Sequence, residues 1–556
     1  MKLLWLDINA SYSHSSLALP ALEAQLDNNL RDVVEWRIVS GTIKSVRDEV
    51  IEEVVDACAD FIFATGWLFN IDYLLSVLRR VATISPNVKI VLGGPEFLGD
   101  NREFLIANRF VTSVFKGEAE EVFQDFIRII ANDIESNEWL SLPGFEYVGR
   151  DGEECGYIAK ECVKTKNFNT LNAPEESSFF NWNKAFVQVE TSRGCFNSCR
   201  FCVSGIGGSD VEDLPVEKIR GRLQNIVGKG IKEVRILDRT FNANSRRAVE
   251  LISLFEEFYG KLKFHLEVHP TMLSPILKEK LQSIPQGLLH VEAGIQSLNE
   301  EVLCSCARKG SSAGAVAGLE YLLGLDKFEV HTDFIAGLPG YTYENLVEDI
   351  RRMMEIYPHE IQLELLKLLP GTYFRSHAQE LGIAYSPEPP YEVLRTSAIE
   401  FAQLRKCSVL SKIIEYWYND VSWRKIFAGM VVAEKGFLYT ITDYFSEKAF
   451  MEHTYSFEGK SMLLYTFCKE NYPEYLTEIS LGWIANGLSI KKEPASELKM
   501  WHYGDSDVKN PLLDENNSYK TYHYIDYENV RHWFAYDKSA DRHKPVAYYK
   551  EKTDIS

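Results

Sequence analysis

The sequence ETSRGCFNSCRFC occupies residues 190–202 and overlaps the end of a short strand-like run at residues 185–190. Its cysteines, Cys195, Cys199 and Cys202, have the spacing C-x3-C-x2-C, which places three thiolates on one short loop. Such a loop can bind three corners of a four-iron cluster. The fourth iron would then have no protein ligand, and a metal centre needs an open position of this kind to bind a substrate.

Two other roles are open to cysteines that lie so close together. A structural zinc ion needs four protein ligands, and no CxxC or HxxxH partner lies nearby in the sequence. Cysteines that serve as small apolar side chains need apolar neighbours, whereas Arg193, Asn197 and Ser198 flank these three. The pattern therefore favours an iron–sulfur cluster.

The residues around and after this loop alternate between strand-like and helix-like segments. Six units of a strand followed by a helix are too few to close an eight-stranded barrel, so the pattern predicts a partial (β/α)6 barrel. Functional groups in such a barrel lie at the carboxyl ends of the strands. The predicted strands are 185–190, 233–238, 262–268, 288–292, 328–335 and 361–368.

Residues 1 to about 130 show a second alternation of strands and helices. Strict alternation predicts a doubly wound, five-stranded parallel sheet, with its ligand at the carboxyl ends of the strands. The predicted strands are 3–8, 33–39, 60–65, 88–92 and 111–115. The loops at their carboxyl ends include the candidate ligand-binding residues Gly66, Trp67, Gly93, Gly94, Gly117 and Glu118.

The whole chain is therefore predicted to have α/β architecture in four parts. Residues 1–135 form the doubly wound domain, 136–182 a linker, 183–385 the partial barrel and 386–556 a mainly helical α+β domain. The last part ends in a tail rich in Tyr and Trp. These aromatic side chains either line a substrate pocket that caps the barrel or pack a core of their own.

The cysteine loop, with Phe201 before its last cysteine, resembles the signature of the radical S-adenosylmethionine (SAM) superfamily. Later segments resemble further motifs of that family: ILDRTFN at 236–242, VEAGIQS at 291–297 and DFIAGLPG at 333–340. The resemblance covers residues 185 to about 382. It implies that SAM binds the open iron, and that one electron from the cluster breaks the sulfonium bond to give a 5′-deoxyadenosyl radical.

The resemblance also implies which side chains bind SAM. Arg308 suits the carboxylate of SAM and Gln296 its ribose hydroxyls, because a guanidinium pairs bidentately and an amide both donates and accepts. Asp238 belongs to the segment near the amino group, and Gly337 to the turn beside the adenine. The full set of SAM-binding candidates is Phe201, Asp238, Glu292, Gln296, Arg308 and Gly337.

The N-terminal domain resembles the cobalamin-binding domain of cobalamin-dependent radical enzymes, through GGPE at 93–96 and GEAE at 117–120. This resemblance assigns cobalamin to the six loop residues named above. The usual cobalamin module has a D-x-H-x-x-G loop whose His ligates cobalt. Here the corresponding stretch, 7–14, reads DINASYSH with the wrong spacing, and only His14 remains as a candidate ligand. Loss of cobalamin from this domain is the alternative.

We therefore expect a radical SAM enzyme that uses cobalamin to methylate an unactivated carbon of a small molecule or peptide. A flavodoxin or ferredoxin would supply the electron. A methylthiotransferase is disfavoured, because its N-terminal domain brings three more cluster cysteines, whereas residues 1–150 contain only Cys58. Two alternatives stay open: a cobalamin-assisted rearrangement or cyclisation, and an iron–sulfur electron-transfer protein that does not use SAM.

Composition and charge indicate which partners and which cellular compartment to expect. With 80 acidic and 60 basic residues the net charge is −20, which disfavours binding to nucleic acid. No apolar run approaches the ~20 residues that a membrane-spanning helix needs. The N-terminus lacks the apolar stretch of a signal peptide, so we expect a cytoplasmic protein whose ten cysteines stay reduced.

Overall fold

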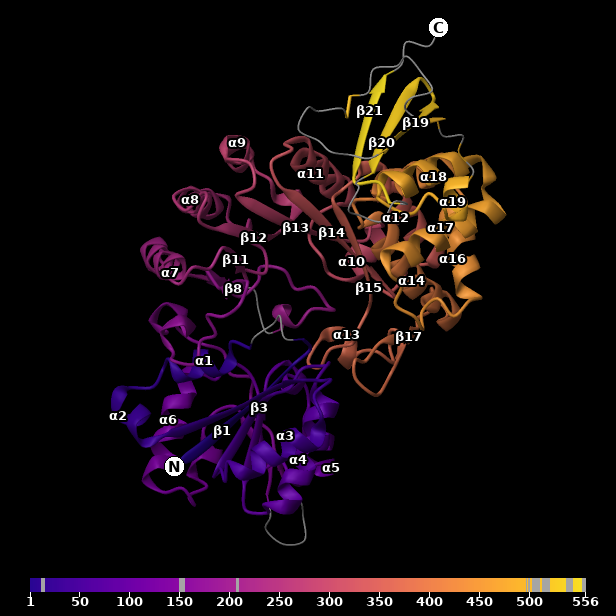
Figure 1. Cartoon of the computed structure of the whole chain (residues 1–556). Coiled ribbons are helices and arrows are strands. Elements are labelled where there is room, and N and C mark those ends of the chain that lie inside the picture. The colour runs from indigo at the N-terminus through magenta and orange to yellow at the C-terminus, as the bar shows by residue number, and fades with distance from the viewer. Residues whose placement is uncertain are drawn as a thin grey trace. The chain divides into compact units, whose positions relative to one another are not determined.

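The computed structural model describes residues 1–11, 16–149, 156–206, 210–496, 498, 501–502, 511–512, 521–536 and 544–552 (Figure 1). They belong to two compact units. The first unit is Met1–Thr342 with Leu365–Leu404, and the second is Tyr343–Glu364 with Arg405–Ser556. None of the described helices combines the length and the apolar character needed to cross a bilayer.

The first sheet of the first unit has seven strands, in the order β2-β1-β3-β4-β5-β6-β7. Its first five strands along the chain are parallel, as predicted: β1 (Lys2–Asn9), β2 (Glu35–Thr42), β3 (Phe61–Thr65), β4 (Lys89–Gly93) and β5 (Ser113–Phe115). The helices between them are α1 (Ala18–Glu23), α2 (Asn28–Val33), α3 (Arg47–Asp56), α4 (Ile71–Ile84), α5 (Arg102–Ala107) and α6 (Glu120–Asn132).

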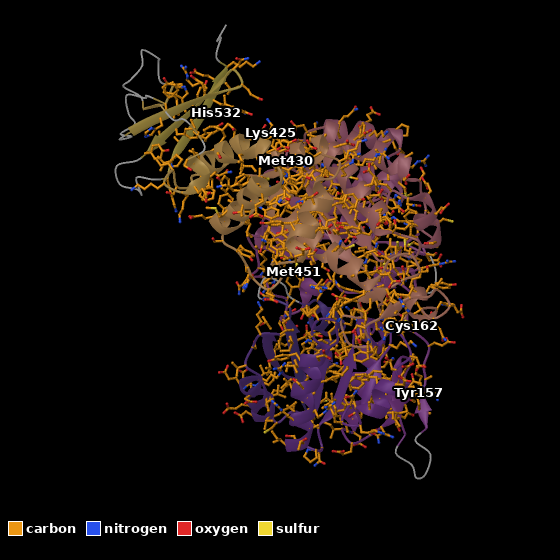
Figure 2. The ribbon with its side chains drawn as sticks, turned by 90° about the vertical axis from the view of Figure 1, so that its right-hand side faces the viewer. Tyr157, Cys162, Lys425, Met430, Met451 and His532 are labelled. Atoms are coloured by element: carbon orange, nitrogen blue, oxygen red, sulfur yellow. The ribbon has the colours of Figure 1, made fainter. Side chains whose placement is uncertain are left out.

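Two antiparallel strands extend the edge of this sheet: β6 (Phe145–Val148), which overlaps the strand-like residues 145–147 of the predicted linker, and β7 (Tyr157–Ile158), which the sequence did not predict. The buried Glu146 carboxylate holds them in place. It accepts hydrogen bonds from the hydroxyl of Tyr157 at 2.8 Å and from the side-chain amide of Asn101 at 2.7 Å. Tyr157, on the edge strand, is labelled in Figure 2. Part of the stretch between the two predicted domains thus completes the first sheet.

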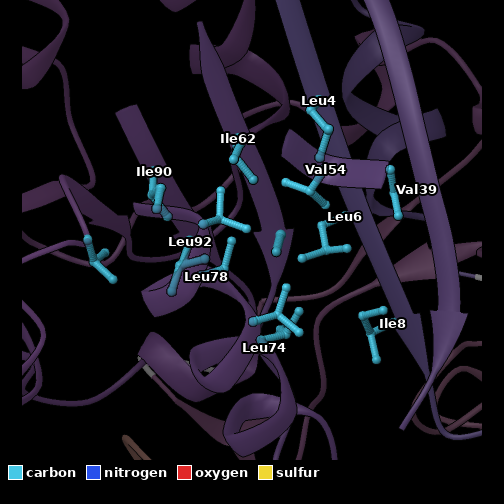
Figure 3. Packing of buried hydrophobic residues seen from close by; sticks show 14 of the residues in the cluster. Leu4, Leu6, Ile8, Val39, Val54, Ile62, Leu74, Leu78, Ile90 and Leu92 are labelled. Atoms are coloured by element: carbon cyan, nitrogen blue, oxygen red, sulfur yellow. The ribbon is translucent and has the colours of Figure 1, made fainter. Parts of the chain in front are cut away.

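Both faces of the sheet are covered, because successive side chains of a strand point to opposite faces. Leu4, Leu6 and Ile8 of β1 pack with Ile62 and Leu74 on one face, beneath α3 and α4 (Figure 3). On the other face, a second cluster joins side chains of β1, β3 and α6, many of them aromatic: Leu3, Trp5, Phe61, Phe63, Phe123 and Phe126. Burying each large apolar side chain contributes roughly 1.5–3 kcal/mol to stability.

The second sheet is the predicted partial barrel. Five parallel strands lie side by side in the order β8 (Phe186–Val189), β11 (Glu233–Ile236), β12 (Lys263–Val268), β13 (Leu289–Gln296) and β14 (Glu329–Ala336). The sheet order ends with β15 (Glu360–Leu365). The helices between the strands are α7 (Val216–Gly228), α8 (Ser245–Glu256), α9 (Pro275–Ser283), α10 (Glu300–Ser305) and α11 (Ser312–Gly324).

Side chains of β13 alternate strictly between buried and partly exposed. Leu289, Val291, Ala293 and Ile295 are the buried ones, which leaves the polar side chains in the positions between them. This alternation gives the barrel one apolar face and one polar face. The polar face supplies the side chains that can bind ligands or react. Hydrophobic runs in the sequence did not reveal this face.

The second unit is mainly helical with a small sheet, as predicted. Its helices are α12 (Tyr343–Ile356), most of α14 (Phe401–Ile413), α15 (Arg424–Ala433), α16 (Phe437–Ser446), α17 (Phe457–Asn471) and α18 (Leu476–Ala485). The antiparallel strands of the sheet are β18 (Trp501–His502), β19 (Thr521–Tyr527), β20 (Val530–Tyr536) and β21 (Ala547–Lys552). Trp417, Trp423 and Trp483 are fully buried, and so are Trp533 and Phe534 of β20. Many aromatic side chains of this unit therefore pack a core.

Candidate active site

Cys195, Cys199 and Cys202 line one cavity of about 190 Å³ at the carboxyl ends of the barrel strands. All three are free thiols; the first two are buried and the third is partly exposed. Among the described residues, no three His, Cys, Asp or Glu side chains converge as a single metal ion requires. Three thiols in the lining of one cavity suit a multi-iron cluster, which binds thiolates at several of its irons.

The loop that carries the cysteines is held from several sides. At its start, the Asp238 carboxylate accepts hydrogen bonds from the backbone amides of Thr191 at 2.7 Å and Ser192 at 2.9 Å. Further along, the Arg200 backbone amide donates to the carbonyl of Cys306 at 2.9 Å. These contacts hold the loop that carries the thiols.

Arg308 supplies positive charge beside the thiols. Its guanidinium lies 3.9 Å from the sulfur of Cys199 and donates to the carbonyl of Gly294 at 2.6 Å. Burial raises the pKa of the Cys199 thiol, and Arg308 opposes that rise because a cation favours the thiolate. Since a cluster binds thiolates, this donor set suits one.

Four of the six predicted SAM-binding residues line the cysteine cavity: Phe201, Glu292, Gln296 and Arg308. The other two do not line it. Asp238 is buried, and its carboxylate is occupied by Thr191 and Ser192. Gly337 lies in the turn after β14, beside Val393 and Leu404.

Gln296 has a strained backbone at this cavity. Its φ is +70°, a left-handed conformation that non-glycine residues rarely adopt, and the register of β13 against β14 shifts between Gly294 and Gln296. Strain of this kind persists where the surrounding structure enforces it, often at functional sites.

Several further side chains line the cavity and were missed from the sequence, among them the titratable Glu267, His269 and Asp333. Burial raises the pKa of Glu267 to about 7, although the nearby Arg239 opposes the rise. Burial lowers the pKa of His269 to about 4, and burial with the adjacent Glu292 carboxylate raises the pKa of Asp333. The period-two alternation of β12 to β14 was the signal that could have found Glu267 and Asp333.

A second, larger cavity of about 650 Å³ lies at the carboxyl ends of the first sheet. Gly93, Gly94, Gly117 and Glu118 line it, as expected for a ligand site of this sheet. Its apolar lining includes Trp5, Phe63, Phe115, Phe123 and Phe126, which the sequence did not single out, and the partly exposed Cys162 (Figure 2).

The second cavity fits a large, flat ligand such as a corrin. A Cβ atom at Gly93 would meet no protein atom closer than 3.9 Å, so the missing side chain opens the backbone to the cavity rather than to a packed neighbour. Gly66 and Trp67 do not line the cavity. The Gly66 amide donates to the Gly93 carbonyl at 2.7 Å, and Trp67 is 39% exposed and stacks on Phe69. His14 lies outside the described residues.

The two cavities are adjacent, because Ser204 and Arg239 line both of them. Ser204 follows the last cysteine of the loop, and Arg239 follows β11. A ligand in either cavity can therefore reach the same region of the first unit.

Known families match three parts of the chain. Residues 189–353 match the family described as "Radical SAM superfamily" and residues 6–127 the "B12 binding domain". Residues 379–484 match "Protein of unknown function (DUF4080)".

Among similar sequences is the ribosomal protein uS12 methylthiotransferase RimO of Carboxydothermus hydrogenoformans, 25% identical over 29% of this chain and 39% of that protein. Another is the uncharacterized methyltransferase PH0819 of Pyrococcus horikoshii, 24% identical over 64% of this chain and 77% of that protein. The chain spans less than half the length of the first curated relatives it matches.

Two solved structures share the fold. The cobalamin-dependent S-adenosylmethionine radical enzyme OxsB, with aqua-cobalamin and S-adenosylmethionine bound, has a TM-score of 0.56 and 15% identity, over 86% of this chain and 78% of that one. The radical S-adenosylmethionine methyltransferase TsrM of Kitasatospora setae has a TM-score of 0.53 and 14% identity, over 69% and 77%. The chain therefore contains a region that matches the radical SAM superfamily, preceded by one that matches the B12-binding domain and followed by one from a family of unknown function.

Proposed function

We propose that the protein cleaves SAM reductively at a [4Fe–4S] cluster and, with cobalamin, methylates an unactivated carbon of a small molecule or peptide. The observation that carries this proposal is the pair of adjacent cavities with Ser204 and Arg239 in both linings. A substrate that reaches this shared region lies within reach of both cofactor sites. When bound, the cluster and SAM supply a carbon radical, and cobalamin supplies the methyl group.

Seven residues that line the cysteine cavity have a proposed task. Cys195, Cys199 and Cys202 hold the cluster. Arg308, whose guanidinium keeps donors beyond the one used on Gly294, pairs with the SAM carboxylate. Gln296 offers its amide to the ribose, with Glu292 beside it. Phe201 contributes an aromatic face to the same cavity.

Asp238 and Gly337 act indirectly in this proposal. Asp238 sets the start of the cysteine loop through Thr191 and Ser192, and Gly337 lets the chain turn after β14. Neither needs to touch SAM.

In the second cavity, the backbones of Gly93, Gly94 and Gly117, with Glu118, would hold cobalamin, and aromatic side chains would supply apolar contact. Gly66 supports this site through its hydrogen bond to Gly93. Trp67, exposed in the loop after β3, stays a candidate cobalamin contact although it does not line the cavity.

The alternatives predict different cavities. An electron carrier has no use for Arg308 and Gln296 in a cavity beside the cysteines. A nucleic-acid substrate would need a basic groove, whereas Glu118, Glu120, Glu190 and Glu212 all line the larger cavity. A flavodoxin or ferredoxin remains the proposed reductant, and the cytoplasm, which keeps thiols reduced, the proposed compartment.

Anaerobic reconstitution tests the proposal. The protein is loaded with iron, sulfide and hydroxocobalamin and then incubated with SAM and reduced flavodoxin. The proposal predicts 5′-deoxyadenosine from the cluster site, and S-adenosylhomocysteine that forms only when cobalamin is present. Formation of neither product by protein with full iron content would contradict it. A rearrangement enzyme would make 5′-deoxyadenosine without cobalamin-dependent S-adenosylhomocysteine.

A further inference from the structure

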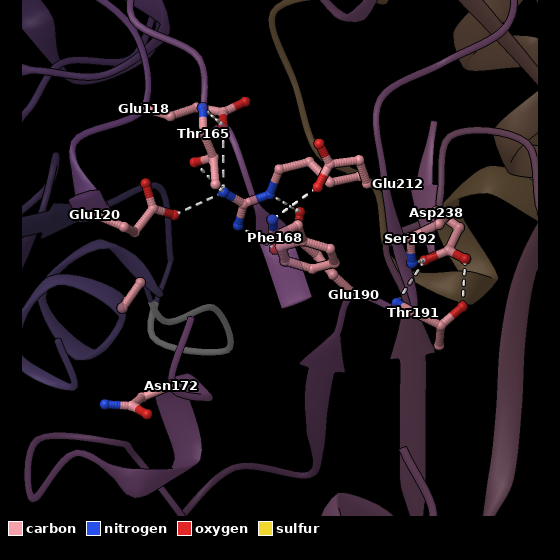
Figure 4. Close-up of polar contacts among 12 residues, drawn as sticks. Glu118, Glu120, Thr165, Phe168, Asn172, Glu190, Thr191, Ser192, Glu212 and Asp238 are labelled. Atoms are coloured by element: carbon pink, nitrogen blue, oxygen red, sulfur yellow. Dashed lines mark hydrogen bonds and ion pairs between the residues drawn. The ribbon is translucent and has the colours of Figure 1, made fainter. Parts of the chain in front are cut away.

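Arg193, two residues before Cys195, lies at the centre of a cluster of charged groups. Its guanidinium donates to Glu190 at 2.6 and 3.2 Å, to Glu120 at 2.9 Å and, at longer range, to Glu118 at 3.4 Å. It also donates to the hydroxyl of Thr165 at 3.3 Å. Figure 4 shows these acceptors grouped around the one guanidinium. No step of the proposed function uses this side chain.

The partners of Arg193 come from separate parts of the first unit. Glu118 lies in the loop after β5 that lines the larger cavity, and Glu120 begins α6. Glu190 and Arg193 lie on the chain that leads from β8 into the cysteine loop. Thr165 belongs to the stretch between the two sheets, and its backbone amide donates to Glu118 at 2.9 Å. One side chain therefore ties the loop of the proposed cobalamin site to the loop of the proposed cluster.

The burial of Arg193 and the aromatic ring beside it strengthen these contacts. Its side chain is 19% exposed, and the guanidinium carbon lies 4.6 Å from the centre of the Phe168 ring. Three carboxylates surround one cation, so they would repel one another if the cation were removed. A guanidinium reaches several acceptors in one plane, whereas an ammonium is a point charge with three donors.

We propose that Arg193 is a positioning residue that fixes the cobalamin loop relative to the cluster loop and so couples methyl transfer to SAM cleavage. This inference rests on the proposed function. Transfer between two bound groups is sensitive to their separation, and a displacement of about 1 Å can cost on the order of 100-fold in rate. Without Arg193, the two loops would hold their cofactors at a less well-defined distance.

Arg222 of α7 provides a matched control. It is also largely buried, with a side chain 10% exposed, and it pairs with the Glu175 carboxylate at 2.7 Å. It even donates to the backbone carbonyl of Glu190 at 3.0 Å. Its described hydrogen bonds reach Glu175 and Glu190 but neither Glu118 nor Glu120. Loss of Arg222 therefore removes a buried ion pair without releasing the cobalamin loop.

The test compares Arg193→Gln and Arg193→Lys with Arg222→Gln and Arg222→Lys in protein reconstituted with both cofactors. Two products are measured without any substrate: S-adenosylhomocysteine, which reports methyl transfer to cobalamin, and 5′-deoxyadenosine, which reports cleavage at the cluster. We expect Arg193→Gln to lower the ratio of the first product to the second at least 10-fold. We expect Arg193→Lys, which keeps the charge, to lower it less, and the Arg222 variants to keep the wild-type ratio.

An unchanged ratio in Arg193→Gln with full iron and cobalamin content would overturn the inference, as would an equal fall in Arg222→Gln. If Arg193→Gln does not retain its cofactors, Arg193→Lys decides in its place: a fall of at least 3-fold supports the inference and a wild-type ratio overturns it. The magnetic interaction between Co(II) and the reduced cluster, measured by electron paramagnetic resonance, should weaken in the Arg193 variants alone. If the wild-type protein forms neither product, the proposed function fails, and this inference fails with it.

Discussion

The carboxylate of Asp238, two residues after β11, accepts a hydrogen bond from the backbone amide of Thr191, 2.7 Å away and two residues after β8. The Thr191 hydroxyl donates to the second oxygen of the same carboxylate. Burial raises the pKa of Asp238, and these hydrogen bonds oppose the rise. Asp238 thus organises the start of the cysteine loop from the neighbouring strand.

Replacing Asp238 should therefore damage the cluster without removing a ligand. In Asp238→Ala the amides of Thr191 and Ser192 lose their acceptor, which costs on the order of 1–3 kcal/mol for each buried group left unpaired. We expect iron content after reconstitution to fall by half or more. Asp238→Asn keeps a carbonyl oxygen for the amides and should stay near wild type. Full iron content in Asp238→Ala would contradict this role.

Gly117 should be required for cobalamin binding. Its φ is +113°, and a Cβ there would lie 2.2 Å from the carbonyl oxygen of Val163. Gly117→Ala should displace the loop that lines the larger cavity and lower the cobalamin bound per chain, measured by absorbance after gel filtration. Gly221→Ala is the control, because nothing lies within 4 Å of its Cβ position and Ala favours the α7 helix. Equal cobalamin content in the two variants would refute the prediction.

Glu267 should make the folded protein less stable as the pH rises. Its pKa rises from an ordinary 4.5 to about 7, so its contribution to stability is complete below pH 4.5 and is lost as pH rises through 7. At pH 8 the ionised group costs at most about 3 kcal/mol. Glu267→Gln should raise the melting temperature of the cofactor-free protein at pH 8 but not at pH 4.5.

Glu292 on the next strand is the matched control for Glu267. Its pKa is lowered, first by its hydrogen bond to His265, so Glu292→Gln should lower the melting temperature at pH 8. Shifts of the same sign in both variants would show that the two carboxylates do not differ as described.

Gln296 should strengthen SAM binding through its side chain while its backbone conformation lowers the stability of the fold. Both Gln296→Gly and Gln296→Ala remove the amide, so both should weaken SAM binding, about 10-fold for the loss of one hydrogen bond to a partner left unpaired. Only glycine relieves the left-handed backbone, a strain of about 1–2 kcal/mol. Gln296→Gly should therefore melt at a higher temperature than Gln296→Ala. Equal melting temperatures would argue against strain at this position.

Local patterns were enough to predict the two sheets and part of the site. The spacing of Cys195, Cys199 and Cys202 and the parallel strands depend on neighbouring residues, which a single sequence displays. Glu267 and Asp333 depend on register, because only pairing of β12, β13 and β14 brings their side chains to one cavity. The same limit hid β7 and the pairing that adds β6 to the first sheet, both of which depend on the buried Glu146.

Other predictions named the correct loop but not the orientation of the side chain. Asp238 directly follows the second barrel strand, yet its carboxylate turns to Thr191 rather than to the cavity. Trp67 lies in a loop at the carboxyl ends of the first sheet, yet its ring stacks on Phe69. The orientation of a side chain depends on its packing against residues that are distant in the sequence. A short motif does not contain that information.

The central claim is that three cysteines hold a cluster that cleaves SAM, and its most direct measurement is iron per chain together with 5′-deoxyadenosine formation in single alanine variants. Cys306→Ala is the control, because Cys306 is buried and its pKa is raised by burial to about 12, which disfavours the thiolate that a ligand needs. We expect Cys195→Ala, Cys199→Ala and Cys202→Ala each to lose most of their iron and all product formation, while Cys306→Ala keeps both. Full iron content and product formation in any one of the three would contradict it.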